Sequence, residues 1–216
     1  KQFSLLPDYR AVFETKNSAE SIFEVQFDAV NSNSLSFFFY PTNLGGRNEV
    51  GPRGIGSNLE AAYEAGDRRK NASISPRVVV DGRTIPEGIG IKYYRPGTGE
   101  DNVRVIRLAE MYLTGAEALA QLDNIPGSLA LLNEVRQRAG LPAILAAGVA
   151  DKSALLDRIA NERRVELAME GHRWFDLIRT GKAQSVLGIT DPNKLLFPIP
   201  QRETINNPVI GQNPGY

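Results

Sequence analysis

Residues 162–179 read ERRVELAMEGHRWFDLIR and are the stretch that decides the fold. They contain the only His and the only Trp of the 216 residues, among closely spaced carboxylates and guanidinium groups. Glu162, Glu166 and Glu170 recur every four residues, so they stack along one side of a predicted helix. Carboxylates are rarely buried unless they are paired. We therefore predict that this side faces protein and that nearby arginines neutralise it.

The expected partners are the arginines of the same stretch, because a guanidinium group can hold a carboxylate through two hydrogen bonds. They are Arg163, Arg164, Arg173 and Arg179. The prediction is a structural ion-pair clamp that comprises Glu162, Arg163, Glu166, Glu170, His172, Arg173 and Asp176.

A metal site in this stretch is the competing interpretation. The Glu-x-x-His spacing of di-iron bundles and the His-Glu-x-x-His of zinc hydrolases are both absent. A second histidine ligand is impossible, and the arginines would repel a divalent cation. We favour the clamp and predict no metal, no catalytic residue and no cofactor. Gly171 is expected to end the first helix, after which Trp174, Phe175, Leu177 and Ile178 turn inward.

Composition narrows the function further. With 25 basic and 25 acidic residues the chain has no net charge, so nothing favours nucleic acid or an anionic membrane surface as a partner. The absence of Cys excludes disulfides and cysteine-ligated metals. No apolar run is long enough to span a bilayer, and no signal peptide is recognisable. The start at Lys1 suggests a mature or truncated piece.

The chain changes character along its length, and we predict three regions. Residues 1–102 are loop-rich with short strands, residues 103–182 are helical, and residues 183–216 form an extended C-terminal wrap. The fold class is mainly α with irregular regions and a few short strands.

In the first region we expect a half-buried strand at 21–27, where Ile22, Phe23, Val25 and Phe27 alternate with polar residues. Further short strands are expected at 35–40, 77–80 and 90–94, the last two around turns at Asp81-Gly82 and Pro86–Gly88. A short helix capped by Ser57 is expected to run to Glu64.

In the second region two helices, 107–122 and 127–139, are joined by a short link into a hairpin resembling one tetratricopeptide unit. The first should bury Leu108, Tyr112, Ala116, Leu119 and Leu122, and the second Leu129, Leu132 and Val135. One hairpin cannot bury both of its faces, so a further element must cover it, either residues 151–180 or a missing part. The prolines of the tail exclude regular structure there, and Leu196, Phe197 and Ile199 should dock.

Seven short stretches together carry a family resemblance. They are FEVQF (23–27), GDRR (66–69), RLAEMYLTGAEAL (107–119), RQRAGLP (136–142), ERRVELAMEGHRWFDLIR (162–179), FPIP (197–200) and QNPGY (212–216). In this order and spacing the chain resembles the SusD/RagB family, over roughly the C-terminal half of a member. Arg68 stands where the family commonly has Pro.

The resemblance implies a SusD-like fold whose N-terminal tetratricopeptide helices, lipoprotein signal and acylated Cys are not in this sequence. It implies a non-enzymatic, outward-facing lipoprotein of the outer membrane that binds glycan, or in some members peptide. The partner would be a SusC-like TonB-dependent transporter, with membrane contact through a lipid anchor. The shared motifs are fold-determining, so the ligand stays open.

Glycan binding needs flat apolar faces for C–H groups and planar polar side chains for hydroxyls. Two stretches offer both. The first comprises Phe37, Phe38, Phe39, Tyr40, Asn43, Arg47, Asn48 and Arg53, and the second Tyr93, Tyr94 and Arg95. The alternative for the first stretch is a place in the core, since consecutive aromatics on a strand send at least one side chain inward. The alternative for the second stretch is an amphipathic edge. Trp174 is predicted to be core.

Two other functions remain open from the sequence. A glycoside hydrolase with a carboxylate pair is compatible with the acidic residue count, although no Gly-x-Ser-x-Gly elbow or phosphate loop occurs. A structural or adhesin-like module that docks another protein is the second. Turnover of an oligosaccharide would identify the first, and failure to retain any polysaccharide would favour the second.

Overall fold

The computed structural model describes residues 2–52, 58–80 and 83–216. Arg53, Ser57 and the turn at Asp81-Gly82, which the sequence singled out, lie outside the described residues. The α-helices are α1 (Ala11–Glu14), α2 (Leu35–Phe39), α3 (Arg69–Ser73), α4 (Leu108–Gln121), α5 (Ile125–Arg138), α6 (Lys152–Glu166), α7 (His172–Arg179), α8 (Ala183–Leu187) and α9 (Gln201–Asn206). The strands are β1 (Ser21–Val25), β2 (Val78–Val80), β3 (Arg83–Ile85) and β4 (Val103–Arg107), and the 3-10 turns are η1 (Thr42–Leu44), η2 (Glu60–Ala62), η3 (Ala146–Gly148) and η4 (Pro192–Leu195).

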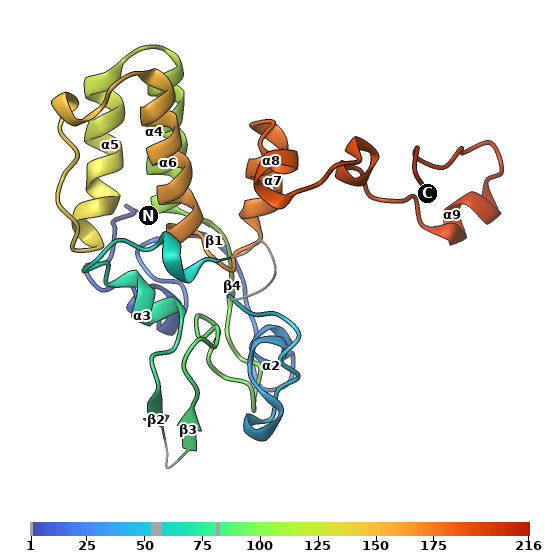
Figure 1. Ribbon diagram of the computed structural model, residues 1–216. Coiled ribbons are helices and arrows are strands. Elements are labelled where there is room, and N and C mark those ends of the chain that lie inside the picture. Colours follow the sequence, from blue (N-terminus) through green and yellow to red (C-terminus); the bar gives the residue numbers. More distant parts are fainter. Residues whose placement is uncertain (1, 53–57, 81–82) are drawn as a thin grey trace. The chain divides into compact units, whose positions relative to one another are not determined.

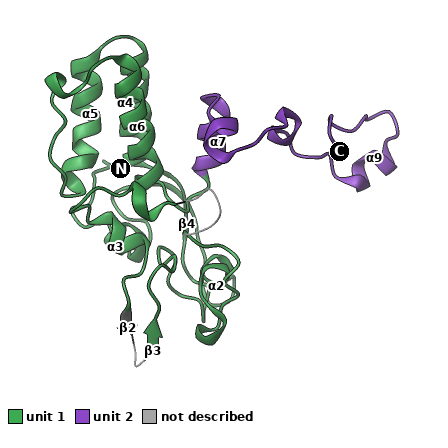
Figure 2. Cartoon of the chain, viewed as in Figure 1, with its two compact units in different colours: residues 1–171 green, residues 172–216 purple. Residues whose placement is uncertain are grey.

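The structure divides the chain into two compact units, residues 1–171 and 172–216, shown in green and purple in Figure 2. The division predicted at residues 102 and 182 was based on composition. In the structure the first predicted region and most of the helical region belong to unit 1. The mainly helical fold class with short strands is confirmed (Figure 1).

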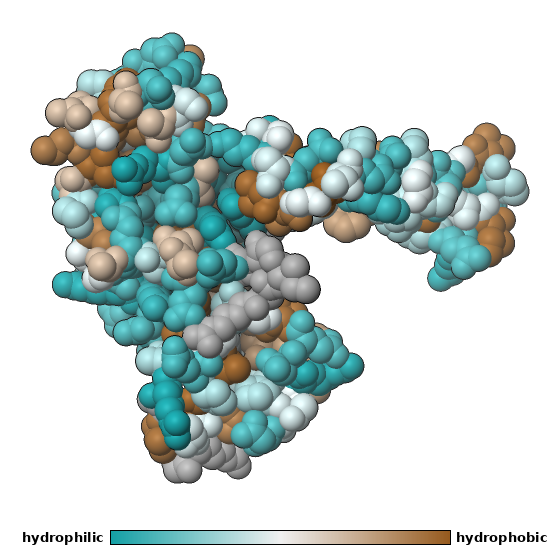
Figure 3. Space-filling model, viewed as in Figure 1, coloured by the Kyte–Doolittle hydropathy of each residue, from teal (hydrophilic) through white to brown (hydrophobic). Residues whose placement is uncertain are grey.

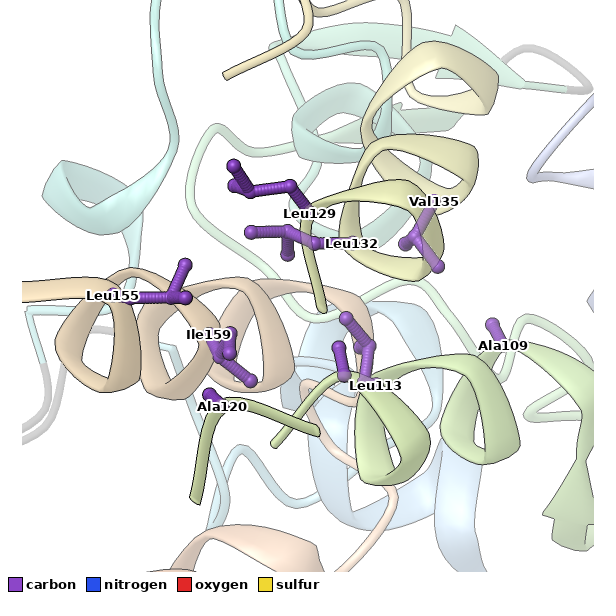
Figure 4. Packing of buried hydrophobic residues seen from close by; sticks show 9 residues of the cluster. Ala109, Leu113, Ala120, Leu129, Leu132, Val135, Leu155 and Ile159 are labelled. Atoms are coloured by element: carbon purple, nitrogen blue, oxygen red, sulfur yellow. The ribbon is translucent and has the colours of Figure 1, made fainter. Parts of the chain in front are cut away.

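The core of unit 1 lies among α4, α5 and α6, which confirms the predicted hairpin. Of the two covers that the sequence left open, residues 151–180 provide one through α6. Asn124 caps α5 through a bond from the Gly127 N–H, and Asp151 caps α6 through one from Ala154. The buried side chains meet between the helices as in Figure 4: Ala109, Leu113, Ala116, Ala120, Leu129, Leu132, Val135, Leu155 and Ile159.

The buried stripe of α4 differs from the predicted one. Ala109, Leu113, Ala116 and Ala120 face the core, whereas Leu122 is 77% exposed. The small alanines lie innermost because the neighbouring helices approach closely, a preference that counting large apolar residues does not detect. The predicted face of α5 is confirmed, since Leu129, Leu132 and Val135 are all buried.

The strand predicted at 21–27 exists, but its faces are the reverse of those predicted. β1 pairs antiparallel with β4, with Phe23 opposite Ile106 and Glu24 opposite Arg104. The polar Glu24 and Arg104 are buried, while Ile22, Phe23 and Val25 are exposed. The inward side is polar because Glu24 and Arg104 form a buried ion pair there. The pairing of β1 with β4 is irregular around Phe23.

Other expectations for the first region need correction. Residues 35–39 form the short helix α2 rather than a strand, and the helix expected to reach Glu64 is the single turn η2. The strand at 77–80 is present as β2, paired with β3. Residues 90–94 form no strand and contribute one isolated bridge, from Gly90 to Ile74.

Unit 2 also departs from the sequence expectations. Only Leu177 of the predicted inward residues of α7 is buried; Phe175 is 67% and Ile178 is 37% exposed. Trp174 is half-buried against Phe197, with the ring centroids 5.8 Å apart.

The tail is not wholly extended, because it contains η4 and α9. Leu196 and Phe197, which were expected to dock, are both exposed. Its last residues fold back on residues 196–199. The Gln212 side chain accepts from the Ile199 N–H and donates to the Ile199 carbonyl, and the Tyr216 hydroxyl donates to the Leu196 carbonyl. These contacts join the FPIP and QNPGY stretches.

Within the described residues no helix combines the length and apolarity needed to cross a bilayer. On the face of the molecule in Figure 3, hydrophobic residues are interspersed among hydrophilic ones.

Candidate functional site

The three glutamates of the decisive stretch are buried and ion-paired, but their partners come from distant segments. Glu162 and Glu166 lie on α6. Glu170 lies in the turn after it, because α6 ends at Glu166 and Met169 and Gly171 adopt positive φ. The cations are Arg69, Lys92, Arg107, Arg136 and Arg138. We call these eight side chains the ion-pair clamp.

Glu166 lies at the centre of the clamp and has no exposed side-chain surface. Its Oε1 accepts from Arg107 Nη1 at 2.6 Å and from Arg138, and its Oε2 accepts from Arg69 Nη1 at 3.0 Å. Three guanidinium groups therefore surround one carboxylate. Glu20 supports two of them, since it accepts from Arg107 and Arg138 at 2.9 Å each.

Glu162 and Glu170 hold the two flanks of the clamp. Glu162 contacts Arg69 at 2.6 Å and Arg136 at 3.0 Å. Glu170 accepts from Arg107 Nε at 2.7 Å and from Lys92 Nζ at 2.8 Å. The clamp thus connects α3, β4, α5 and α6 to the segment that contains Lys92.

Burial and the cations act against each other on the pKa values of these groups. Burial alone would raise the pKa of Glu166, but Arg138, Arg107 and Arg69 outweigh it and hold that pKa well below its usual range. The pKa of Glu170 is lowered in the same way by Arg107 and Lys92. Burial prevails at Glu162, whose pKa is raised, and at Lys92, whose pKa falls to about 8.

Arg163 and Asp176, two further residues of the predicted clamp, have partners of their own. Arg163 donates to the Thr114 hydroxyl at 3.1 Å, and Asp176 accepts from Arg179 on the same helix at 2.8 Å. His172, Arg173 and Asp176 belong to unit 2. Among the described residues no group of three or more His, Cys, Asp or Glu side chains is arranged to hold a metal ion.

The arginines that pair with these glutamates come from distant segments, whereas the prediction considered only the arginines of the same stretch. The signal was nevertheless present: Arg69, Arg107, Arg136 and Arg138 all lie in the short stretches GDRR, RLAEMYLTGAEAL and RQRAGLP. Charged residues that sit within otherwise apolar or turn-forming stretches in several segments are candidates for one shared network. Lys92, between Ile91 and Tyr93, also meets this description, although it lies outside the seven stretches.

The first predicted ligand stretch is split by α2 into a buried and an accessible part. Phe39 and Tyr40 are buried against Tyr93 in an aromatic cluster. Phe37 and Phe38 are half-buried, with ring centroids 5.6 Å apart in an edge-to-face arrangement. Asn43, Arg47 and Asn48 are exposed on the loop that follows. The α2–loop surface is defined as Phe37, Phe38, Asn43, Arg47 and Asn48.

Backbone hydrogen bonds fold residues 41–50 back onto α2. The Arg47 N–H donates to the Phe37 carbonyl at 2.8 Å, and the Asn48 N–H donates to the Tyr40 carbonyl at 2.8 Å. Gly46 permits this close return, because a Cβ there would lie 2.0 Å from the Tyr40 carbonyl oxygen.

We therefore expect Gly46→Ala to displace residues 41–50 and to lower the free energy of unfolding by at least about 1 kcal/mol. Urea unfolding and amide exchange at Arg47 and Asn48 measure the two effects. Gly51→Ala is the matched control, since a Cβ there meets nothing within 4 Å. Equal behaviour of the two variants would show that the close return is unimportant.

The second predicted stretch offers less to a sugar. Tyr93 is 2% exposed, and its ring stacks on Phe39 with centroids 6.2 Å apart. Two guanidinium groups lie over the Tyr94 ring, those of Arg10 at 4.5 Å and Arg95 at 4.4 Å. A sugar would have to displace a guanidinium group in order to stack there, so the α2–loop surface is the better candidate.

Comparison with known proteins agrees with this architecture. The model of the SusD family matches residues 49–194. SusD-like protein P38 of Formosa agariphila is 36% identical over 138 residues, which are 58% of this chain and 27% of P38. The chain therefore spans only part of the length of this relative.

Solved structures are similar over nearly the whole chain. Surface glycan-binding protein A from Bacteroides thetaiotaomicron, in complex with laminarihexaose, is 26% identical with a TM-score of 0.74, covering 98% of this chain and 56% of that one. A laminarin-binding SusD-like protein is 29% identical with a TM-score of 0.74, covering 100% of this chain and 54% of that one. The chain thus spans about half the length of these proteins. The family match covers more than half of the chain, which therefore belongs to the SusD family.

Proposed function

We propose that the protein binds glycan at the cell surface through the α2–loop surface and does not catalyse a reaction. The observation that carries this proposal is the arrangement of two half-buried aromatic rings, Phe37 and Phe38, beside the exposed amide and guanidinium groups of one loop. Ring faces suit sugar C–H groups, and planar polar side chains suit hydroxyl pairs. Two similar proteins, one in complex with laminarihexaose and one described as laminarin-binding, support the ligand class.

The ion-pair clamp supports a binding rather than a catalytic role. Its three glutamates are paired with guanidinium and ammonium groups and are buried. A glycosidase would need two carboxyl groups free to face the scissile bond. Hydrolysis of an oligosaccharide by the purified protein would contradict this part of the proposal.

Binding is tested by calorimetric titration with laminarihexaose and a panel of other oligosaccharides. We expect a dissociation constant between about 1 μM and 1 mM for at least one glycan, because a carrier must also release its ligand. Phe38→Ala and Arg47→Ala should each weaken binding at least about tenfold, the loss of about 1.4 kcal/mol, with little change in melting temperature.

Two controls match these variants. Phe23→Ala removes a 54% exposed ring on β1, and Arg202→Ala removes an exposed guanidinium on α9. Neither should change glycan affinity. Unchanged affinity in Phe38→Ala and Arg47→Ala would place the ligand elsewhere, and binding of peptides but no glycan would favour the peptide-binding alternative.

The wider role follows the family. We infer that the complete protein is an outward-facing lipoprotein of the outer membrane that delivers its ligand to a SusC-like TonB-dependent transporter. Co-purification of a tagged full-length protein with a barrel encoded in the adjacent reading frame tests the partner. Retention of neither a barrel nor any polysaccharide would favour a structural interaction module.

A further inference from the structure

Met169 lies in the turn between α6 and α7 in an uncommon conformation. Its φ is +64°, in the left-handed region that residues other than Gly, Asn and Asp seldom occupy. Both neighbours are held by the ion-pair clamp: Lys92 Nζ donates to the Ala168 carbonyl at 2.5 Å, and Arg107 Nε donates to Glu170 at 2.7 Å. The clamp thus maintains a backbone conformation that the turn would not adopt by itself.

The side chain of Met169 bridges two parts of the core. It packs against the cluster of Leu59, Tyr63, Ile74, Val165 and Ala168 and also against the aromatic cluster of Phe39, Tyr40 and Tyr93. Gly90 lies between Met169 and α2. A Cβ on Gly90 would be 2.7 Å from Phe39 Cδ1 and 2.8 Å from Met169 Sδ. Phe39, Gly90 and Met169 are therefore in close contact, with no room for another methyl group.

α2 is held in place by buried side chains rather than by the stability of the helix itself. α2 has five residues and no side-chain cap, and helices this short are not stable alone. Its anchors are Phe39 and Tyr40, which are 6% and 5% exposed. The Phe37 carbonyl of α2 and the carbonyl of Tyr40, the residue after it, accept hydrogen bonds from the loop.

We propose that Met169 is a positioning residue for the α2–loop surface. It connects the rigid ion-pair clamp, across Gly90, to Phe39 and so fixes α2 and the loop folded onto it. The part that concerns glycan affinity rests on the function proposed above, whereas the positioning of α2 does not.

Amide exchange measured without ligand tests the positioning. In Met169→Ala, exchange of the Arg47 and Asn48 amides should be at least about tenfold faster, while amides of Leu113, Leu132 and Ile159 stay as in the wild type. Met169→Leu, which refills most of the volume, should restore slow exchange. Met111→Ala is the matched control, because the other methionine is 41% exposed on α4. Equal exchange at Arg47 and Asn48 in the two alanine variants would overturn the proposal.

Titration with laminarihexaose, or with the tightest glycan of the panel, tests the consequence for binding. Met169→Ala should weaken binding at least about fivefold, and Met169→Leu and Met111→Ala should bind as the wild type does. Faster exchange with unchanged affinity would contradict the link to ligand binding. If the wild type binds no glycan while exchange responds as expected, the proposed function fails and the positioning role stands.

Discussion

Glu166→Ala is expected to lower the free energy of unfolding by about 3 to 5 kcal/mol, the usual cost of removing one partner from a buried ion network. The variant leaves Arg69, Arg107 and Arg138 facing a cavity without the carboxylate that neutralises them. Arg69 keeps its ion pairs with Asp67 and Glu162, and Arg107 keeps those with Glu20 and Glu170. These remaining acids still neutralise part of the buried positive charge, which limits the loss of stability.

Urea unfolding followed by circular dichroism measures this effect. Glu134→Ala is the matched control, because Glu134 is exposed on α5 and its removal should change stability by no more than about 0.5 kcal/mol. Glu166→Gln separates charge from volume, since it retains the shape but cannot neutralise three guanidinium groups. If Glu166→Ala were as stable as Glu134→Ala, the clamp would not be what holds the fold together.

The second large effect is a rise in stability with pH caused by Lys92. Burial lowers the pKa of Lys92 to about 8 in the folded protein, whereas an unfolded lysine has a pKa of about 10.4. Between these two values the unfolded chain binds more protons than the folded one, so the free energy of unfolding increases with pH. Over pH 8 to 9.5 the expected gain is about 1.5 kcal/mol.

Lys92→Met provides the reference, because it keeps the volume of the side chain and removes the titration. The difference in stability between wild type and variant should grow in favour of the wild type from pH 8 to 9.5. Buried tyrosines with raised pKa values, including Tyr63 and Tyr93, act in the opposite direction near pH 10, and they cancel in this difference. A constant difference across the range would show that the pKa of Lys92 is not lowered in the folded protein.

The sequence predicted most of the helical framework correctly. α5 begins at an Asn124 cap and buries the predicted Leu129, Leu132 and Val135, because a period of 3.6 and a capping residue are local properties. Of the candidate site it predicted that Glu162, Glu166 and Glu170 need cationic partners, but not which cations. It also named Phe37 and Phe38 as candidate ligand-binding residues, but it could not tell that the adjacent Phe39 and Tyr40 are buried.

The amino-acid sequence by itself determined the hairpin of α4 and α5, the need to neutralise buried carboxylates, and the family to which the chain belongs, because capping, periodicity and motif spacing depend on neighbours along the chain. Only the tertiary structure decided that Arg69, Arg107 and Arg138 surround Glu166, that β1 turns Glu24 inward and Phe23 outward, and that residues 35–39 coil into α2. These outcomes depend on contacts between segments up to about a hundred residues apart, such as Arg69 with Glu166. There the electrostatics of a buried charge network outweigh the local preference of apolar residues for the interior.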